Sequence, residues 1–184
     1  MEVDSKEAME RLREDLLAVV GQGLEFLKGL DQEAYQRARP ELGLSSIGAH
    51  YRHHLDHVEA WLSGVEKGRI DYDDRRKNMA VEVDRQAALG STEDLCQRLR
   101  GEKRTREEIL VLQRSRDDGE RRREVKSTVE RELLFVLSHA IHHYAIMGLA
   151  ARLSGVKPPS CFGVMPATRE YHRQREPEGM ARAQ

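Results

Sequence analysis

Histidine is the residue type whose distribution is most uneven in this sequence. Seven of the eight histidines fall into two short clusters that are far apart in the chain. An α-helix turns about 100° per residue, so each cluster would lie within an arc of roughly 100° on its own helix. The sequence therefore predicts two stripes of imidazole side chains. The first contains His50, His53, His54 and His57, and the second contains His139, His142 and His143.

The second stripe is expected to point into the protein interior, and a metal ion would explain why. Neutral imidazoles in an apolar interior would leave ring nitrogens without partners, at a cost of roughly 1–3 kcal/mol for each unsatisfied group. His139 and His143, spaced i and i+4, can place two nitrogens on one divalent ion, and the first stripe can supply a third. Spacing alone leaves the choice within the first stripe open. The apolar residues on the face of the second stripe are Phe135, Val136, Ile146, Leu149 and Leu153.

A carboxylate close to the second stripe is a candidate for chemistry. Glu132 lies two turns before His139 and could orient a histidine ligand or act as a base. An exposed glutamate in the first turn of a helix, favoured by the helix dipole, is an equally good interpretation. The glutamate of a His-Glu-x-x-His motif is missing, which argues against a helical zinc protease. We expect Arg52 and Asp56 to be solvated and Trp61 to lie in the core.

Composition narrows the class of protein. The 184 residues suit one domain, and 31 basic side chains nearly cancel 32 acidic ones, so no global field would attract nucleic acid or an acidic membrane. Cys96 and Cys161 are far apart and show no Cys-x-x-Cys spacing, which argues against a disulfide framework or a thiolate zinc site. No N-terminal run has the charged, apolar and small-residue zones of a signal peptide, so we expect none, and we expect the longest apolar stretches to fall short of a membrane span. The expected location is the cytoplasm.

Four long helices are expected to carry the histidines and the core. Apolar residues recur at helical spacing, and each helix except the third has a capping serine or threonine or a glycine near its expected ends. The second helix begins at Ser45 or Ser46 and the fourth at Thr128. The expected ranges are 5–30, 46–64, 84–99 and 128–155.

Three segments outside these helices carry weaker patterns. Residues 68–78 look like a surface loop, because turn formers and charges occur there without periodicity. An Asp-Asp-Gly turn at residues 117–119 between apolar residues predicts a short β-hairpin, although a charged extension of the third helix is an alternative. After Pro158, the segment with Phe162, Val164 and Met165 is expected to pack on the bundle before a polar tail that frays.

The two histidine segments, SSIGAHYRHHLDH and RELLFVLSHAIHHYAIMGLAARLSG, resemble the signature helices of the DinB/YfiT-like superfamily. The segments DYDDRR and CFGVMPAT resemble loop and tail segments of its bacterial members, and the resemblance covers about Leu44 to Thr168. It implies an all-α four-helix bundle of DinB/YfiT type, with the small hairpin before the last long helix. The chain would then form a single domain over residues 1–168, with a polar tail at 169–184.

The same resemblance implies a set of metal ligands. Matched position by position to the family pattern, the ligands are His53, His139 and His143, with zinc or nickel as the expected ion. Since histidines are in surplus, His50, His57 and His142 stay as alternates.

Relatives of this kind imply two kinds of function. One is an enzyme, either a metal-dependent hydrolase or a thiol-dependent transferase acting on a small molecule. The other is a non-catalytic metal-binding or stress-response bundle, in which the ion is structural and completes folding. The expected partners are a small-molecule substrate or thiol, neither nucleic acid nor membrane is expected, and a homodimer is compatible with either function.

Overall fold

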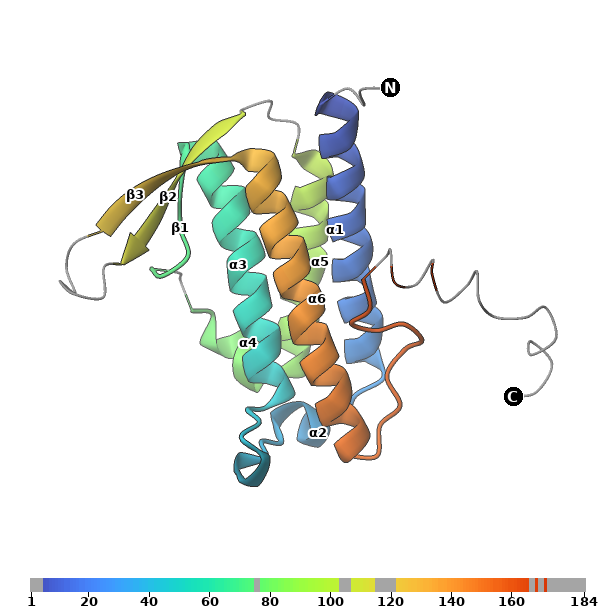
Figure 1. Cartoon of the computed structure of the whole chain (residues 1–184). Helices are drawn as coiled ribbons and strands as arrows, with labels where there is room; N and C mark the ends of the chain where they lie inside the picture. The colour runs from blue at the N-terminus through green and yellow to red at the C-terminus, as the bar shows by residue number, and fades with distance from the viewer. Residues whose placement is uncertain are drawn as a thin grey trace.

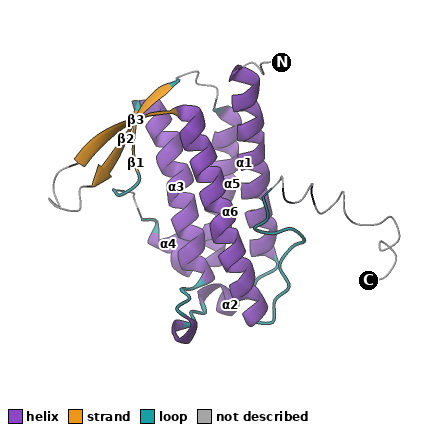
Figure 2. Cartoon of the chain, in the orientation of Figure 1, coloured by secondary structure: helices purple, strands orange, loops and turns teal. Residues whose placement is uncertain are grey.

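The computed structural model describes residues 5–74, 77–102, 107–114 and 122–165, together with residues 168 and 171. Four long helices lie side by side as a bundle, and a small sheet lies at one end of it (Figures 1 and 2). The all-α four-helix fold expected from the sequence is confirmed. The long helices are α1 (Ser5–Lys28), α3 (Ile47–Lys67), α5 (Arg85–Gly101) and α6 (Val129–Leu153).

Short elements join these helices, and the sequence did not predict them. They are α2 (Gln32–Gln36), a 3-10 turn at Pro40–Leu42 and α4 (Met79–Val83). A helix of about one turn is too short to show the 3.6-residue periodicity from which helices are predicted. These short elements follow from the packing of the chain between the long helices and from caps such as Asp31, whose side chain accepts the Ala34 N–H.

The helix ends that bear on the histidines follow local rules. Ser46 and Thr128 cap α3 and α6, with side chains that accept the N–H groups of Ala49 and Arg131. At the end of α6, the Gly155 N–H donates to the Arg152 carbonyl and the Val156 N–H to the Ala151 carbonyl, with Gly155 at φ 79°. This is a Schellman motif, in which glycine avoids the strain of the left-handed conformation.

The predicted end of α3 at Gly64 is wrong. The helix continues to Lys67, and Gly68 ends it in the left-handed conformation, with φ 78°. Gly64 is instead buried, and a Cβ there would overlap the side chain of Ile70. The glycine therefore permits the chain after α3 to return closely along the helix.

A three-stranded sheet covers one end of the bundle. β2 (Glu108–Arg114) pairs antiparallel with β3 (Arg122–Thr128), so the predicted hairpin is confirmed, although its turn at residues 117–119 lies outside the described residues. β1 (Arg69–Asp71) pairs in parallel with β2. The prediction of a loop over residues 68–78 is therefore wrong at β1. A strand of three residues is too short to be recognised from alternation alone, and its partner strand is distant in sequence.

The core runs between the helices, and α6 contributes its most apolar face. The centre of that face is formed by Leu133, Ala140, Tyr144 and Ala151. His139 precedes Ala140, so its side chain lies about 100° around the helix from that centre. The sequence analysis assigned Leu149 and Leu153 to the buried face of α6, and this is wrong. Their side chains are 51% and 43% exposed. The histidines of α6 thus lie at the border of the core.

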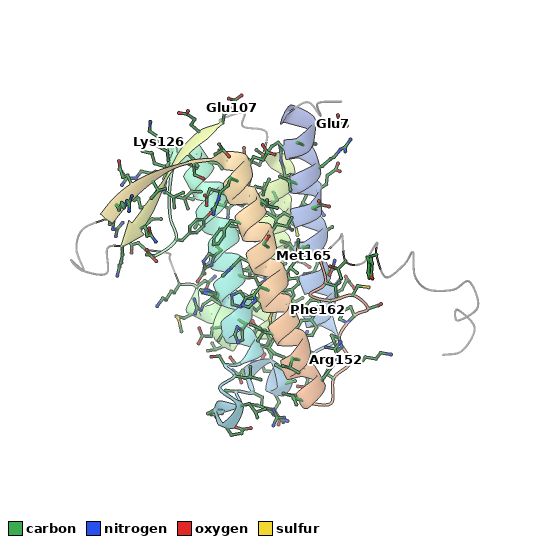
Figure 3. All side chains as sticks on the ribbon, viewed as in Figure 1. Glu7, Glu107, Lys126, Arg152, Phe162 and Met165 are labelled. Carbon is green, nitrogen blue, oxygen red and sulfur yellow. The ribbon has the colours of Figure 1, made fainter. Side chains whose placement is uncertain are left out.

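The segment after Pro158 packs on the bundle through one aromatic side chain. Phe162 is buried and stacks on Phe26 and Tyr144, as expected for the segment after Pro158 (Figure 3).

One helix of the described part of the chain, α6, is long and apolar enough to cross a membrane, judged by length and composition only. The sequence analysis expected no stretch of that kind. More than half of its most apolar window, 56%, is buried inside the bundle, as in the core helix of a soluble protein.

Candidate metal centre

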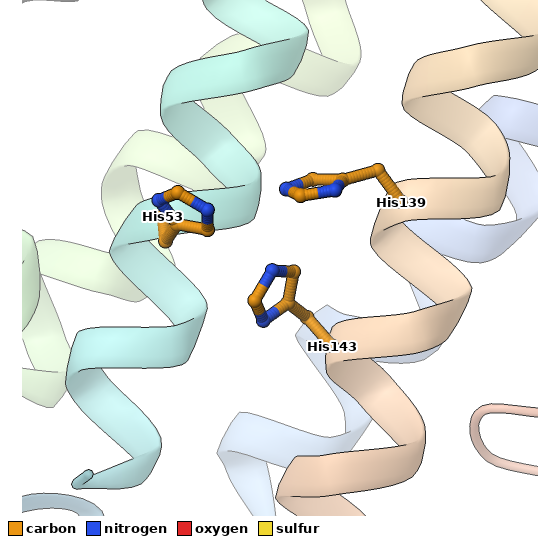
Figure 4. A group of neighbouring side chains, drawn as sticks. All are labelled: His53, His139 and His143. Atoms are coloured by element: carbon orange, nitrogen blue, oxygen red, sulfur yellow. The ribbon is translucent and has the colours of Figure 1, made fainter. Parts of the chain in front are cut away.

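Three histidines from α3 and α6 converge between these two helices (Figure 4). His53 comes from α3, and His139 and His143 lie one turn apart on α6. One ring nitrogen from each lies within 4.8 Å of those of the other two. The ring centroids are 4.5 Å apart for His139 and His143, and 4.8 Å and 5.1 Å from His53 to these two rings. The structure thus brings together the three positions named from the family pattern.

The cluster lies at the edge of the core, where it is shielded from water without being closed off. His143 is 7% exposed, whereas His53 and His139 are half-buried. The position of His53 follows from the geometry of α3. The apolar side of this helix, with Tyr51, Leu55 and Val58, faces the core, and His53 lies at the border of that side. The side chains are therefore held by the packed helices while one side of the cluster stays accessible.

The buried environment keeps the imidazole of His143 neutral. Burial, and after it the neighbouring histidines with His139 first, lower the pKa of His143 to about 3. Burial and His142 also lower the pKa of His50. A neutral imidazole offers a nitrogen lone pair, and this is the form that binds a metal ion. His143 is thus in the protonation state that ligation requires.

Two more histidines of α3 support the cluster. His50 Nδ1 and His143 Nδ1 are 3.1 Å apart, with one donating to the other, so Nε2 is the His143 nitrogen left to bind an ion. His57 Nδ1 donates to the His53 carbonyl at 2.8 Å, because a carbonyl oxygen can only accept. Its ring lies 4.0 Å, centroid to centroid, from that of His139. His50 therefore orients the ring of His143 by a hydrogen bond, whereas His57 packs against the rings of His53 and His139.

The geometry fits a transition metal after small adjustments. Ligand nitrogens of a tetrahedral zinc ion bound at 2.0–2.1 Å lie about 3.3 Å from one another. The nitrogens of this cluster lie within 4.8 Å, so rotations of the three rings would bring them to that separation. Among the residues that the structure describes, no fourth side chain of a ligating type joins this group. The set therefore contains three protein ligands.

The remaining histidines of the two stripes, His54 and His142, do not belong to the group of three that could hold the ion. His54 is completely buried between the rings of Tyr51 and Tyr144, at centroid distances of 4.8 Å and 4.9 Å. Neither of its ring nitrogens has a hydrogen-bond partner among the described residues, and burial lowers its pKa well below the usual value. His142 is exposed, and His172 lies outside the described residues.

Glu132 is not an exposed first-turn glutamate. Its side chain is 2% exposed, and Oε1 accepts hydrogen bonds from Ser127 Oγ at 2.6 Å and Arg131 Nη1 at 2.9 Å. Burial and the adjacent Glu132 carboxylate raise the pKa of the Tyr72 hydroxyl. The exposed interpretation is therefore wrong, and a role for Glu132 in orienting a histidine ligand or as a base stays a prediction.

The expectation for Arg52 and Asp56 was also wrong. Asp56 is buried and pairs with Arg52 at 2.6 Å, and Arg52 bridges to Glu82 on α4 at the same distance. The i and i+4 spacing of Arg52 and Asp56 could have indicated the pair, but α4 was not predicted. Trp61 lies in the core as expected, and its indole N–H donates to the Val129 carbonyl.

Tyr72 is a residue that the sequence reading missed. Its ring stacks on His57 at 5.4 Å and lies 5.1 Å from Phe135, which in turn stacks on His139 at 5.6 Å. These rings form an aromatic wall between the cluster and the sheet. The available signal was the alternation of Ile70 and Tyr72 around Asp71, which places both away from solvent once β1 is recognised.

A comparison with models of known protein families found a match that covers the three clustered histidines. The model of the DinB superfamily matches residues 8–147, which include His53, His139 and His143 and all four long helices in whole or in large part. The comparison with curated proteins found no match.

Proposed function

Because the chain belongs to the DinB superfamily, we propose that it binds one divalent transition metal through His53, His139 and His143 and uses the ion on a small molecule. The observation that carries this proposal is the convergence of three ring nitrogens from two helices within 4.8 Å. His143, which is 7% exposed and whose pKa is lowered by burial, contributes a neutral imidazole to this group.

The donor set indicates the class of metal. Imidazole nitrogens suit zinc, nickel and copper, whereas magnesium and calcium prefer oxygen ligands. The cluster contains no carboxylate or thiolate among the described residues. We expect zinc or nickel to bind most strongly under ordinary conditions of metal supply.

An accessible coordination position favours chemistry over a purely structural role. Structural zinc sites have four protein ligands, whereas catalytic sites have three and keep a position for water or substrate. When bound, such an ion would lower the pKa of a water molecule or hold a thiol as its thiolate. The chain itself would orient the ligands through His50 and His57 and exclude water on the sheet side through Tyr72. The proposed reaction is hydrolysis or thiol transfer.

We place the protein in the cytoplasm, and we take residues 1–168 as one domain followed by a short tail. The two cysteines of the chain are both unpaired, which suits a reducing compartment. A reducing compartment would also contain the low-molecular-weight thiols that thiol transfer needs.

The test is metal binding followed by an activity screen. Metal-stripped full-length protein is titrated with zinc, nickel and manganese chloride in a calorimeter, and the loaded protein is analysed for its elements. We expect about one ion per chain, with manganese the weakest of the three. Metal-free protein that takes up neither zinc nor nickel at micromolar concentration would refute the proposal.

The screen then measures ester and amide hydrolysis and thiol consumption with and without metal. Metal-dependent turnover in either reaction supports the catalytic proposal. A protein that binds one ion, is stabilised by it and shows no turnover or binding of external thiol would instead have a structural ion.

A further inference from the structure

The outer side of α6 carries no charge, in contrast to the composition of the chain as a whole. Asp, Glu, Lys and Arg make up 34% of the chain, yet residues 133–151 contain none of them. Part of this segment lies at the surface, since Leu134 and Leu149 are 47% and 51% exposed. α6 packs against α3 and α1, and its outer side faces the viewer in Figure 1 with no described helix across it. An exposed helix face without charge is typical of a surface that binds another molecule.

The exposed residues of this segment form one continuous stripe. They recur every three or four positions and lie within an arc of about 80° on the helix. They are Leu134, Ser138, His142, Ala145 and Leu149, and we call them the α6 stripe. The large leucines lie at its two ends, whereas the small Ser138 and Ala145 lie nearer its middle. This order would let a second helix approach closely at the middle while the leucines pack at either end.

The α6 stripe is symmetric about its own midpoint, and this indicates which partner fits it. Leu134 and Leu149 are equally distant in sequence from the point between residues 141 and 142, and so are Ser138 and Ala145. Two copies of α6 that run antiparallel across a twofold axis at this point would place Leu134 opposite Leu149 and Ser138 opposite Ala145. A twofold contact requires a surface that complements itself in this way. A second copy of the chain therefore fits better than an unrelated protein, which would impose no such symmetry.

We propose that two copies of this chain form a reversible homodimer by packing their α6 stripes antiparallel. The stripe is about 22 Å long and a helix is about 10 Å wide, so the contact is smaller than the roughly 800 Å² per partner of a stable interface. We therefore expect a dimer that forms at tens of micromolar protein. His142 lies at the centre, with its ring centroid 5.2 Å from that of His143. The interface would thus border the metal cluster without using the proposed ligands, and it does not depend on a bound ion.

A membrane fits the α6 stripe less well than a second copy does. The composition of α6 would permit it to cross a bilayer, but 56% of its most apolar window is buried inside the bundle. The exposed remainder is narrow and has the polar Ser138 and His142 near its middle. A helix that lies in a membrane surface instead presents large apolar side chains along its whole inserted face.

Sedimentation velocity of the full-length, metal-stripped protein tests whether the dimer exists. Across concentrations from about 1 to about 200 μM, we expect a reversible shift from monomer to dimer. A protein that stays monomeric at the highest concentration would overturn the proposal. Monomeric protein that instead cosediments with phosphatidylcholine vesicles would also overturn it, since the α6 stripe would then bind lipid.

Two variants test the antiparallel pairing. Leu149→Glu and Leu134→Lys each put a charge opposite a leucine at both ends of the contact, so each should raise the dimer Kd at least about 30-fold. In an equal mixture, the two substituted positions face each other at one end, and two leucines face each other at the other end. The mixture should therefore dimerise at least about fivefold more tightly than either variant alone. A parallel pairing would give no such recovery, so its absence would overturn the proposed arrangement.

Leu42→Glu is the matched control, because Leu42 is 56% exposed and lies outside the α6 stripe. Its dimer Kd should stay within about twofold of that of the unaltered protein. An equal loss of dimer in Leu42→Glu and Leu149→Glu would reject the stripe as the interface. Circular dichroism checks that the variants fold. If Leu149→Glu fails to fold, Ser138→Arg takes its place, since it puts a large charged side chain at an exposed position near the middle of the stripe; unchanged dimerisation of folded Ser138→Arg would reject the interface.

Discussion

His53 and His54 are adjacent in the sequence but belong to two different regions of the molecule. His53 lies in the accessible cluster with His139 and His143, whereas His54 is completely buried between Tyr51 and Tyr144. A rotation of about 100° around α3 separates the two side chains. The same residue type is thus a metal-ligand candidate on one side of the helix and a packing residue on the other, which shows that burial alone does not identify a ligand.

The largest expected effect concerns the accessible cluster. His139→Ala removes a nitrogen that no other described side chain replaces at the same position, so the affinity for zinc should fall by more than about 100-fold, beyond the range for residues that only orient a ligand. Calorimetric titration of the metal-stripped variant gives the value. Ser138→Ala, an exposed neighbour on α6, is the control. Full occupancy in His139→Ala would remove the basis for distinguishing the two regions.

A smaller effect is expected for a residue that holds a ligand in place. His57→Ala removes the ring that bonds to the His53 carbonyl and packs on His139, so zinc affinity should fall about 10–100-fold. The same titration measures it. His142→Ala, which alters an exposed ring on the same cluster edge, should change zinc affinity less than about threefold. A larger loss in His142→Ala than in His57→Ala would reverse the assignment of His57 as a supporting residue.

The smallest effect on metal binding is expected in the tyrosine-lined region. His54→Ala should leave zinc stoichiometry unchanged but reduce the free energy of unfolding by about 2–4 kcal/mol, because it opens a cavity in the core. His54→Leu fills the space and removes two unpartnered nitrogens, so its stability should lie within about 1.5 kcal/mol of the unaltered protein. Denaturant unfolding of metal-free protein measures both. Loss of zinc from folded His54→Leu would show that the two regions are not independent.

Much of the fold could be predicted because its signals are local. Ser46 and Thr128 cap α3 and α6 where the sequence placed them, and the hairpin pairs as expected. β1 and α4 were missed because a few residues carry no periodicity, and their partners lie elsewhere in the chain. Such pairings depend on tertiary contacts that no short window of sequence contains.

The candidate site could be predicted only in part for a related reason. The i and i+4 spacing selected His139 and His143, but spacing alone did not choose among the histidines of α3. The structure brings His53 to these two and turns His54 into the core. Glu132 and Asp56 were misjudged, since their burial arises from a sheet and a short helix that were not fully recognised.

The distance along the chain between the two histidine helices has a kinetic consequence. His50 and His143, whose Nδ1 atoms are 3.1 Å apart, are separated by 93 positions in the sequence. Contacts this distant form late, because a long loop must close before they are made. An ion held between α3 and α6 would then stabilise the native state more than the folding transition state. Its main effect would be to slow unfolding, so the loaded protein should persist longer without folding faster.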